Sequence, residues 1–434
     1  MAQINGREIV LETLLLITRD GEYSHIALKN VLEKYQYLEK KERAFITRVV
    51  EGTLERMIEV DHIINCFSKV KTGKMKPVIR TILRSGVYQL IYMDSVPDSA
   101  VCNEAVKLAA KKGFVNLKGF VNGVLRTISR EKDNIPYPGK DDMTAYLSVK
   151  YSLPEWIVRQ WLPLYGADAV EKMGEEFLKE KAVTVRCNTQ KISPGELKEL
   201  LTSEGVKALE VPGAAEAFYL SGYDHLAALE TFQKGYFYVQ DVSSMQVAHW
   251  AAPAQGDFVL DVCAAPGGKA LHAAELLGGT GMVQARDLTD YKVGLLWENI
   301  ERSGLENIEA VKWDASVPDE SMYEKADIVI ADLPCSGLGV LGKKPDLKYK
   351  MTEEMQESLV NLQRQILDVV HRYVKPGGKL LYSTCTICRK ENEENAAWFA
   401  GEHSEFTLVK EEQRLPGREA GDGFYIAMFQ KEKR

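Results

Sequence analysis

Residues 326–337 read ADIVIADLPCSG. The run up to Ala331 is short, mostly apolar and rich in β-branched side chains, which is typical of a strand buried on both faces of a parallel sheet. It ends at Asp332, and Cys335 follows three residues later. A buried strand that ends with a carboxylate and a thiol marks either the edge of a core or the start of an active site.

Four more runs of this kind occur after residue 236, and helical segments separate them: FVLDVCA (258–264), GMVQARD (281–287), IEAVKWD (308–314) and GGKLLYSTC (377–385). The last is preceded by an expected amphipathic helix that should stop at KPGG (375–378). Its apolar positions are Met355, Leu359, Leu362, Ile366, Val369 and Tyr373. Buried strands that alternate with helices predict a doubly wound α/β domain over residues 236–434.

The region before residue 140 has a different spacing of apolar residues. From residue 5 to about 130 its apolar residues recur at helical spacing, as in Val121, Val124, Leu125 and Ile128, and no alternating strand pattern competes with them. An all-helical domain is therefore expected over residues 1–140. Residues 131–145, EKDNIPYPGKDDMTA, have no periodicity and are typical of a linker.

A small α+β module is expected between residues 145 and 235. VTVRCNT (183–189) alternates like a half-buried strand. A helix should follow it, with Ser193 as the N-cap, Pro194 at the first helical position and Glu196 completing a capping box.

Length and charge limit the class of protein. The 434 residues exceed one ordinary core, and no apolar run approaches the ~18 residues that a membrane span needs. Neither a membrane nor an export signal is indicated, so a cytoplasmic location is expected. Residues 1–140 carry 23 Lys and Arg against 16 Asp and Glu, whereas the remainder carries 32 against 46. Residues 1–140 are therefore expected to bind an anion, although a solvated helical face would carry the same charge.

The strand ends carry groups that suit a nucleotide-like ligand. In a doubly wound sheet, ligands bind outside the carboxyl ends of the strands. The first run leads into Gly267, Gly268 and Lys269, a turn that opens a helix and can turn backbone amides toward an anionic group. The second run ends at Asp287, where an acid commonly accepts hydrogen bonds from a ribose. The third ends at Asp314, which suits an adenine amino group.

These groups together favour an adenosine-type cofactor. The G-x-G-x-x-G dinucleotide pattern and the G-x-x-x-x-G-K-[ST] phosphate loop are both missing, which argues against NAD and ATP as the ligand. S-adenosylmethionine remains as the common adenosine ligand without a polyphosphate, and its carboxylate suits a helix end.

The seven cysteines are an odd number scattered through a long chain, which indicates reduced thiols. Cys385 and Cys388 form a C-x-x-C pair without a second pair or a Cys-His cluster, so no metal site is expected there. Five are expected to be small apolar core residues: Cys66, Cys102, Cys187, Cys263 and Cys388. Cys335 and Cys385 differ, because each follows a buried strand near the proposed cofactor.

Two thiols and an acid beside a methyl donor suit one reaction in particular. Cytosine C5 is a poor nucleophile, but a thiolate that adds at C6 converts the ring into an enamine that can attack a sulfonium methyl group. A carboxylic acid at N3 or at the exocyclic amine would stabilise the adduct, which gives Asp332 a role. The second thiol can help to remove the C5 proton. The residues alone leave open whether Cys335 or Cys385 is the nucleophile.

Three segments in this order, DVCAAPGGK (261–269), DLPCSG (332–337) and STCT (383–386), resemble the Fmu/Sun (NOL1/NOP2/Sun) family of RNA cytosine-5 methyltransferases. The resemblance covers nearly the whole chain. Residues 100–126 resemble the NusB-type RNA-binding domain of bacterial members, and the middle module resembles the family's RRM-like subdomain. It implies a Rossmann-like catalytic sheet and ribosomal RNA as the partner, with no DNA or membrane contact and a monomeric chain.

The resemblance also assigns roles. It implies that Cys385 is the nucleophile that adds to C6, that Cys335 assists release, and that Asp332 holds the base. It implies that S-adenosylmethionine contacts Asp332, that Asp287 binds its ribose and that Asp314 binds its adenine. The cofactor loop that it implies consists of Cys263, Ala264, Ala265, Pro266, Gly267, Gly268 and Lys269. Lys269 can reach the cofactor or Asp332, and the sequence does not decide between them.

The segment GVLGKKPDLKYK (339–350) departs from the family pattern, since Lys343 and Lys344 stand where Arg is frequent. Lysine keeps the charge but loses the bidentate fork of arginine. An exposed RNA strand would suit these lysines together with Lys348 and Tyr349.

Three other functions stay open at this stage. One is methylation of transfer RNA, and another is RNA binding for assembly or transcription control without catalysis. The third is a nicotinamide-dependent oxidoreductase, which the glycine pattern disfavours.

Overall fold

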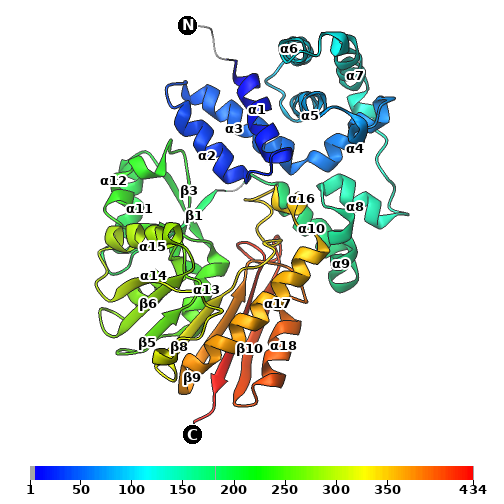
Figure 1. The fold of residues 1–434 in the computed structure, drawn as a ribbon. Helices are drawn as coiled ribbons and strands as arrows, with labels where there is room; N and C mark the ends of the chain where they lie inside the picture. Colours follow the sequence, from blue (N-terminus) through cyan, green and yellow to red (C-terminus); the bar gives the residue numbers. More distant parts are fainter. Residues whose placement is uncertain (1–4, 181, 434) are drawn as a thin grey trace. The chain divides into compact units, whose positions relative to one another are not determined.

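In the computed structural model of the chain, residues 5–180 and 182–433 are described. They form two compact units (Figure 1). The first consists of the residues up to Lys179 together with Leu341–Lys350, and the second of Glu180–Val340 together with the residues from Met351 onward. The predicted domain bounds 1–140, 145–235 and 236–434 stay a prediction, although the helices between 143 and 178 group with the first unit.

The first unit is built from helices, as the apolar periodicity predicts. α5 (Pro77–Tyr92) contacts α1, α3, α4, α6 and α7, and its buried side chains lie at the centre of the core. Gly52 allows α3 to approach α5, because a Cβ there would lie 2.0 Å from the ring of Tyr88. The other helices are α1 (Gly6–Thr18), α2 (Ser24–Lys34), α3 (Lys40–Glu55), α4 (Met57–Phe67), α6 (Asp98–Lys111), α7 (Lys118–Glu131), α8 (Met143–Tyr151), α9 (Glu155–Tyr165), α10 (Ala167–Leu178) and α16 (Leu347–Lys350).

The second unit begins with a small antiparallel sheet in the order β2-β3-β1-β4. Its strands are β1 (Val183–Cys187), β2 (Lys207–Val211), β3 (Ala214–Ser221) and β4 (Phe237–Val239). The helix after β1 is α11 (Pro194–Ser203), and its N-terminus has the predicted capping box between Ser193 and Glu196. The prediction of a half-buried β1 is wrong, because four of its five residues are buried. Val185 and Cys187 pack with side chains of α11, and Arg186 contacts Glu275 and Gln240.

The large sheet has the order β10-β11-β9-β8-β5-β6-β7. β5 to β9 run parallel, and β10 and β11 are antiparallel. The strands are β5 (Phe258–Asp261), β6 (Met282–Asp287), β7 (Ile308–Lys312), β8 (Ala326–Asp332), β9 (Val374–Thr384), β10 (Phe406–Arg414) and β11 (Phe424–Lys431). The five predicted runs thus form the parallel part, and the doubly wound α/β fold is confirmed.

Helices cover both faces of this sheet (Figure 1), which explains why its strands read as continuous apolar runs. On one face Val259 and Ile330 pack with Leu271 of α14 (Gly268–Leu276) and Leu296 of α15 (Asp290–Ser303). On the other face Val329 packs with side chains of α17 (Glu353–Val370) and α18 (Glu393–Glu402).

The helix α17 lies where it is predicted, and three of the six predicted apolar positions are buried: Ile366, Val369 and Tyr373. Met355 is exposed, and Leu359 and Leu362 are partly exposed. The buried face also contains Gln356 and Gln363, which apolar spacing cannot locate. The helix ends at Val370, and 375–378 belong to β9 instead of forming the stop.

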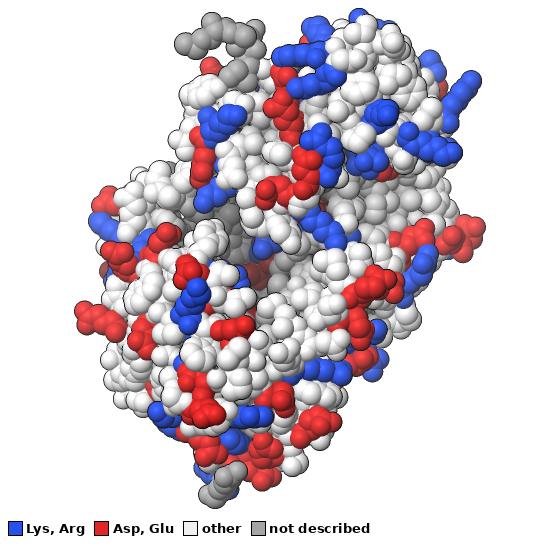
Figure 2. Space-filling view, viewed as in Figure 1, with Lys and Arg blue, Asp and Glu red and all other residues white. Residues whose placement is uncertain are grey.

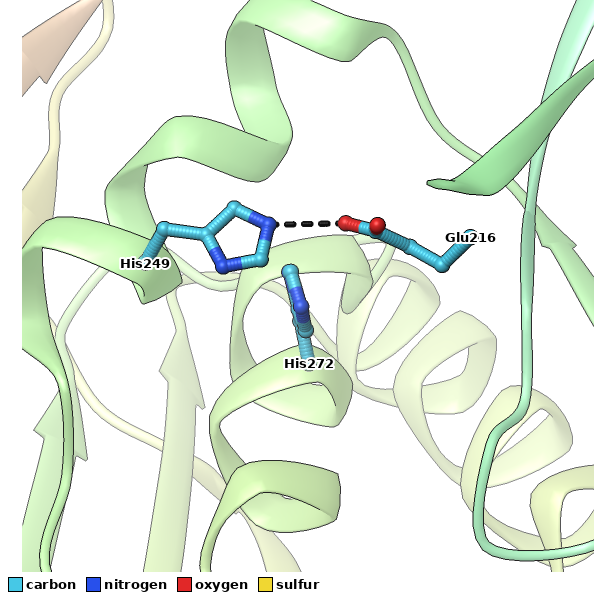
Figure 3. A group of neighbouring side chains, drawn as sticks. All are labelled: Glu216, His249 and His272. Atoms are coloured by element: carbon cyan, nitrogen blue, oxygen red, sulfur yellow. Dashed lines mark hydrogen bonds and ion pairs between the residues drawn. The ribbon is translucent and has the colours of Figure 1, made fainter. Parts of the chain in front are cut away.

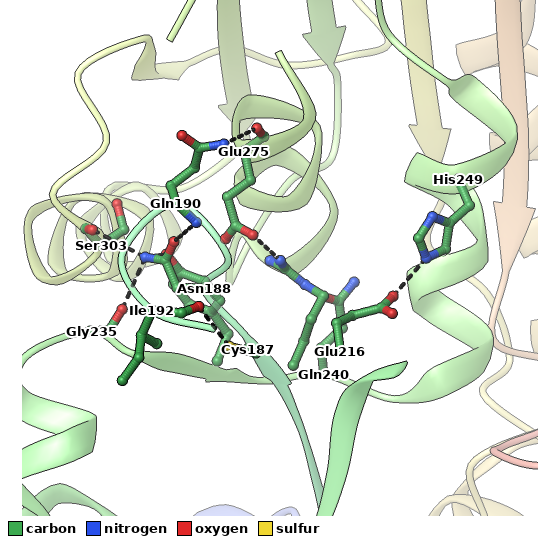
Figure 4. Close-up of polar contacts among 12 residues, drawn as sticks. Cys187, Asn188, Gln190, Ile192, Glu216, Gly235, Gln240, His249, Glu275 and Ser303 are labelled. Carbon is green, nitrogen blue, oxygen red and sulfur yellow. Dashed lines mark hydrogen bonds and ion pairs between the residues drawn. The ribbon is translucent and has the colours of Figure 1, made fainter. Parts of the chain in front are cut away.

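Buried polar contacts join the small sheet to the large one (Figure 4). Arg186 of β1 is 1% exposed and forms an ion pair with Glu275 of α14. Its Nε donates to Gln240 Oε1 at 2.7 Å. Asn188 donates to Tyr238 Oη at 2.8 Å and to the carbonyls of Gly235 at 3.0 Å and Ser303 at 3.3 Å. The buried ion pair of Arg186 and the hydrogen bonds of the Asn188 amide fix the relative position of the two sheets.

Candidate active site

The carboxyl ends of the parallel strands define the candidate site. The strand order reverses at β5: β6 and β7 lie on one side of it, and β8 and β9 on the other. This reversal point is where ligands bind in open α/β sheets. Asp261 ends β5, Asp287 ends β6, Asp332 ends β8, and Cys385 follows β9 directly.

The loop from Cys263 to Lys269 is shaped by hydrogen bonds from its own backbone. Ala264 N donates to Arg286 O at 2.8 Å, and Ala265 N donates to Asp287 Oδ2 at 3.0 Å. Gly267 has φ = 113°, and a Cβ there would lie 3.2 Å from Leu296 Cδ2. A glycine is required at this turn by both the backbone conformation and the space. The turn therefore leaves room beside the first amides of α14, which suits an anionic group.

The two acids predicted to bind ribose and adenine differ in their surroundings. Asp287 is buried, its Oδ1 accepts from Leu288 N at 2.8 Å, and Lys292 Nζ lies 3.0 Å from the same oxygen. Asp314 is exposed, and its Oδ1 accepts from Ser316 N at 2.9 Å and from Ser316 Oγ at 2.6 Å. Asp287 is thus positioned against the cofactor loop, while Asp314 caps the turn that follows β7.

The sequence reasoning missed Asp261 as a site residue. Its side chain is fully buried, and its Oδ2 has no hydrogen-bond partner within residues 5–180 and 182–433. Burial, and then the nearby charge of Asp332, raise the pKa of Asp261 to about 8. A buried carboxyl group with an oxygen without a partner at the switch point requires an explanation, and a polar ligand at this site provides one. The signal in the sequence is its place at the end of the first apolar run.

Lys269 reaches Asp332, which answers the question that the sequence left open. Lys269 Nζ donates to Asp332 Oδ2 at 2.6 Å, and Ser383 Oγ donates to Asp332 Oδ1 at 2.7 Å. Burial acts to lower the pKa of Lys269, but the charge of Asp332, the hydrogen bond to it and the nearby Asp261 and Cys385 outweigh burial and raise it. An ammonium group therefore lies beside Asp332 and within electrostatic range of the Cys385 sulfur.

The two thiols singled out in the sequence are in contact. Cys335 Sγ and Cys385 Sγ lie 3.3 Å apart, and both side chains are partly exposed. The hydrogen bond to Cys385, burial and the charge of Cys385 raise the pKa of Cys335 well above its usual value. This shift favours the protonated form of Cys335, and either sulfur can be the donor in the contact.

A buried polar network that the sequence reasoning missed holds the two loops together. Glu391 is fully buried, and Ser336 N donates to its Oε2 at 2.9 Å. Gln363 Nε2 donates to the same oxygen at 3.0 Å and to Pro334 O at 2.8 Å. Ser336 Oγ lies 2.6 Å from Thr386 Oγ1. The network joins the residues that flank Cys335 to those that flank Cys385. In the sequence, only the polar run KENEEN after STCTICR indicates it.

Gly339 brings a third loop against Cys385. Its amide donates to Cys385 O at 3.0 Å, and its carbonyl accepts from Gly423 N at 2.9 Å. A Cβ at Gly339 would lie 2.0 Å from Gly423 O and 2.8 Å from Cys385 O. The close approach of three backbones fixes the position of the Cys385 carbonyl.

Three of the remaining five cysteines follow the prediction of a buried core position. Cys102, Cys187 and Cys388 are buried, and burial raises the pKa of Cys187 and of Cys388 to about 12. Cys263 is partly exposed, and burial is the main cause that raises its pKa. Cys66 is exposed instead of buried, because it lies on the outer face of α4.

The predicted RNA contacts of the 339–350 segment need a correction. Lys348 is buried, and its Nζ donates to Glu55 O at 2.8 Å. Tyr349 Oη donates to Leu54 O at 2.7 Å. Both side chains therefore satisfy backbone carbonyls at the end of α3 inside the first unit, whereas Lys343 and Lys344 are exposed.

Three family descriptions match the chain: "NusB family" over residues 4–130, "Methyltr_RsmF/B-like, ferredoxin-like domain" over residues 153–224, and "16S rRNA methyltransferase RsmB/F" over residues 248–430. A probable ribosomal RNA small subunit methyltransferase B of Bacillus subtilis is 37% identical over 419 residues, which cover 96% of this chain and 93% of the relative. The chain belongs to the RsmB/F family of 16S rRNA methyltransferases.

Two further comparisons agree with this family. A probable ribosomal RNA small subunit methyltransferase B of Synechocystis is 32% identical and covers 99% of this chain and 100% of the relative. The crystal structure of a protein described as PH0851 is 26% identical, has a TM-score of 0.82 and covers 99% of each chain. The predicted resemblance, the NusB-like helical domain and S-adenosylmethionine as the methyl donor of this RsmB/F methyltransferase are confirmed.

Proposed function

We propose that this RsmB/F protein transfers a methyl group from S-adenosylmethionine to C5 of a cytosine in 16S ribosomal RNA, through a covalent bond between Cys385 and C6. The observation that carries the proposal is the contact between the two thiols, beside Asp332 and at the carboxyl ends of neighbouring strands. Neither a structural scaffold nor a hydride-transfer site needs this combination of groups.

The residues around the first loop fit the methyl donor. Gly267 turns the chain into the start of α14, and Asp287 and the protonated Asp261 place carboxyl groups at the ends of β6 and β5. These residues would hold S-adenosylmethionine, with Asp314 as the proposed contact to the adenine. The bound cofactor supplies an electrophilic methyl group; the base must be activated by the chain's own residues.

Cys385 is the proposed nucleophile because we expect the neighbouring thiol, Cys335, to stay protonated. The hydrogen bond to Cys385 is the first cause that raises the pKa of Cys335. We propose that Cys335 donates in this contact and that Cys385 accepts. The ammonium of Lys269 acts on the same sulfur. A thiolate at Cys385 adds to C6, and the electrons of the C5–C6 double bond move toward C5 and the ring nitrogen.

Asp332 is placed to hold the base. Each of its oxygens already accepts one hydrogen bond, from Lys269 and from Ser383, and each retains a lone pair. A carboxylate in this position accepts from the exocyclic amine of cytosine, and from N3 once that atom is protonated. The charge that develops on the ring during addition is thereby stabilised.

Release of the product then falls to Cys335. While Cys385 is a thiolate, its charge keeps the proton on Cys335. Once the Cys385 sulfur is bonded to C6, that charge is gone and the pKa of Cys335 falls. The Cys335 thiol then loses its own proton to solvent, and the resulting thiolate takes the proton from C5 of the methylated ring. The electron pair of that C–H bond re-forms the C5–C6 double bond, and the C6–S bond breaks to regenerate the thiolate of Cys385.

The helical unit supports RNA as the partner. Lys and Arg side chains gather over α6 and α7 on the face drawn in Figure 2. Some of this charge is internally compensated, since Lys111 and Lys112 pair with Glu8 at 2.6 Å and 2.9 Å. We propose that these helices contact the phosphate backbone, that the substrate is RNA and not DNA, and that the chain acts as a monomer in the cytoplasm. Among the described residues no helix is long and apolar enough to cross a membrane.

The test is methyl transfer followed by identification of the product. Purified protein is incubated with labelled S-adenosylmethionine and either 16S ribosomal RNA or transfer RNA from cells that lack this protein. The RNA is then digested to nucleosides. The proposal expects 5-methylcytidine from 16S RNA with the wild type and none with Cys385→Ala. Equal transfer by Cys385→Ala, a methyl group on another atom, or 5-methylcytidine only in transfer RNA would overturn it.

A further inference from the structure

Two helix ends in the second unit bring three metal-binding side chains together: one ligand atom from each of Asp368, His371 and His403 lies within 4.8 Å of the other two. Asp368 and His371 lie one turn apart at the end of α17, and His403 and Glu405 follow the end of α18. The imidazole rings of His371 and His403 have centroids 4.0 Å apart. His403 Nε2 lies 3.7 Å from Asp368 Oδ1, and His371 Nε2 lies 3.8 Å from Glu405 Oε1. We propose that Asp368, His371 and His403 form a site for a divalent transition metal, with Zn²⁺ as the preferred occupant and Glu405, which lies beside His371, as the fourth ligand.

The separations suit a tetrahedral ion. Bonds of about 2.0–2.1 Å from Zn²⁺ to nitrogen and oxygen place neighbouring ligand atoms roughly 3.3 Å from each other. The observed distances of 3.7 Å and 3.8 Å are too long for a hydrogen bond, yet within about half an ångström of this separation. Two imidazoles and two carboxylates are donors that Zn²⁺ accepts, and they provide four ligands without a thiol.

The tautomer of His371 leaves Nε2 without a proton and free to bind a metal. His371 Nδ1 lies 3.3 Å from Leu367 O, and a carbonyl can only accept, so Nδ1 carries the proton. The lone pair then sits on Nε2, which faces Glu405. A backbone carbonyl that holds the far nitrogen is the usual way in which a metal-binding histidine is oriented.

His403 supplies an independent observation. The residue is 7% exposed, and its Nε2 is buried without a hydrogen-bond partner in the described part of the chain. A buried ring nitrogen without a partner requires an explanation, and a bound ion provides one. Phe399 packs against both rings, with centroids 4.6 Å from His403 and 6.4 Å from His371, which limits their rotation.

The local charge favours a cation. α17 ends at Val370 and α18 ends at Glu402, so the negative ends of two helix dipoles converge on the site. Asp368 and Glu405 are 56% and 39% exposed at their side chains, which gives an ion access from solvent. Arg372 is the nearby cation, and it lies 4.0 Å from the other oxygen of Asp368.

A second group of similar composition is less suited. Glu216, His249 and His272 come together between β3, α13 (Val242–Ala251) and α14 (Figure 3). His249 Nε2 and Glu216 Oε1 are 2.7 Å apart, so they already satisfy each other. The guanidinium of Arg186 lowers the pKa of both Glu216 and His272, as causes secondary to the His249 hydrogen bond and to burial. Its positive charge opposes a metal ion, and the group therefore serves as the internal control.

The test compares carboxylate-to-amide variants, which keep side-chain volume at exposed or partly exposed positions and so preserve the fold. The full chain, freed of any affinity tag and of metal, is titrated with Zn²⁺ in competition with a chromophoric chelator. The same proteins are then loaded with Co²⁺ for visible absorption spectra. The wild type is expected to bind one tight equivalent, to show the strong bands of tetrahedral cobalt, and to lack a thiolate-to-cobalt band. Zinc is also expected to raise its Tm by about 5 °C.

Each variant has a defined expectation. Asp368→Asn combined with Glu405→Gln should lose the tight equivalent, the tetrahedral bands and the zinc-dependent rise in Tm, and Glu216→Gln should keep all three. His371→Ala is the confirming variant and should lower zinc affinity at least a hundredfold. Retention of the tight equivalent by the double variant, its loss in Glu216→Gln, or a thiolate-to-cobalt band would overturn the proposal.

Discussion

Cys335 Sγ and Cys385 Sγ lie 3.3 Å apart, although 50 residues separate them along the chain. The contact follows from the topology, since β8 and β9 are parallel neighbours and both residues follow the carboxyl ends of these strands. The two loops are held in place by a buried carboxylate, a lysine and a close backbone approach. A single substitution can remove each of these contacts without the others.

Glu391→Ala is expected to destabilise the protein by about 3 kcal/mol, because Ser336 and Gln363 lose a buried acceptor. Urea unfolding followed by circular dichroism measures the change. Glu391→Gln, which keeps one acceptor oxygen, should lose less. Glu394→Ala, at an exposed position three residues away, should change the free energy of unfolding by under about 0.5 kcal/mol. Equal effects of Glu391→Ala and Glu394→Ala would show that the network contributes nothing.

Lys269→Gln is expected to move the pH at which activity is half-maximal upward by about one unit. The ammonium of Lys269 interacts favourably with the Cys385 thiolate, and its loss makes that thiolate harder to form. At pH 7 the rate should fall about tenfold, since one pKa unit is worth about 1.4 kcal/mol. Single-turnover methyl transfer between pH 6 and 9 measures the shift. Lys312→Gln, which removes an exposed lysine paired with Asp290, should leave the profile unchanged. An unshifted profile for Lys269→Gln would contradict the electrostatic role.

Gly339→Ala is expected to reduce activity more than stability. The new Cβ would collide with Gly423 O and with Cys385 O, so the loop must shift and the hydrogen bond to the Cys385 carbonyl is lost. The rate of methyl transfer should fall at least tenfold at a temperature where circular dichroism shows a folded chain. Gly294→Ala, in open space on α15, is the matched control and should keep full activity. Full activity of Gly339→Ala would mean that the position of Cys385 does not depend on this contact.

Asp261→Asn is expected to become more stable relative to the wild type as the pH rises from 4 to 8. The pKa of Asp261 is raised to about 8 in the folded chain. Between the ordinary carboxyl pKa and 8, the folded chain binds a proton that the unfolded chain has released, so this group lowers the free energy of unfolding with rising pH by up to about 1.4 kcal/mol per unit. Urea titrations at pH 5 and pH 8 without cofactor measure the difference. The same difference at both values would show that Asp261 is ionised in the folded protein.

The parallel part of the sheet and the placement of its loops could be predicted because strands buried on both faces leave a continuous apolar signature. The same signature located Asp332, Cys335 and Cys385, since parallel neighbours end at one edge. β10 and β11 were not predicted. They are paired antiparallel at the end of the sheet, and β10 is mixed in polarity.

The buried polar residues could not be predicted by apolar spacing. Gln363 lies in the core because it donates to Pro334 O and to Glu391, and nothing in the spacing distinguishes it from a surface glutamine. Lys348 was expected to face solvent, but its ammonium satisfies a carbonyl at the end of α3. Partners far along the chain decide both cases, and a local pattern carries no information about them.

The most direct test of the account is capture of the covalent bond to RNA. Cys335→Ala, incubated with 16S ribosomal RNA and S-adenosylmethionine, should accumulate a protein–RNA species that survives a denaturing gel, because removal of the C5 proton is blocked. After nuclease and protease digestion, mass spectrometry should find the nucleotide on the peptide that contains Cys385, and the variant that also carries Cys385→Ala should show no adduct. A nucleotide on a different residue, or methylated RNA from the Cys335→Ala variant without any adduct, would contradict the account.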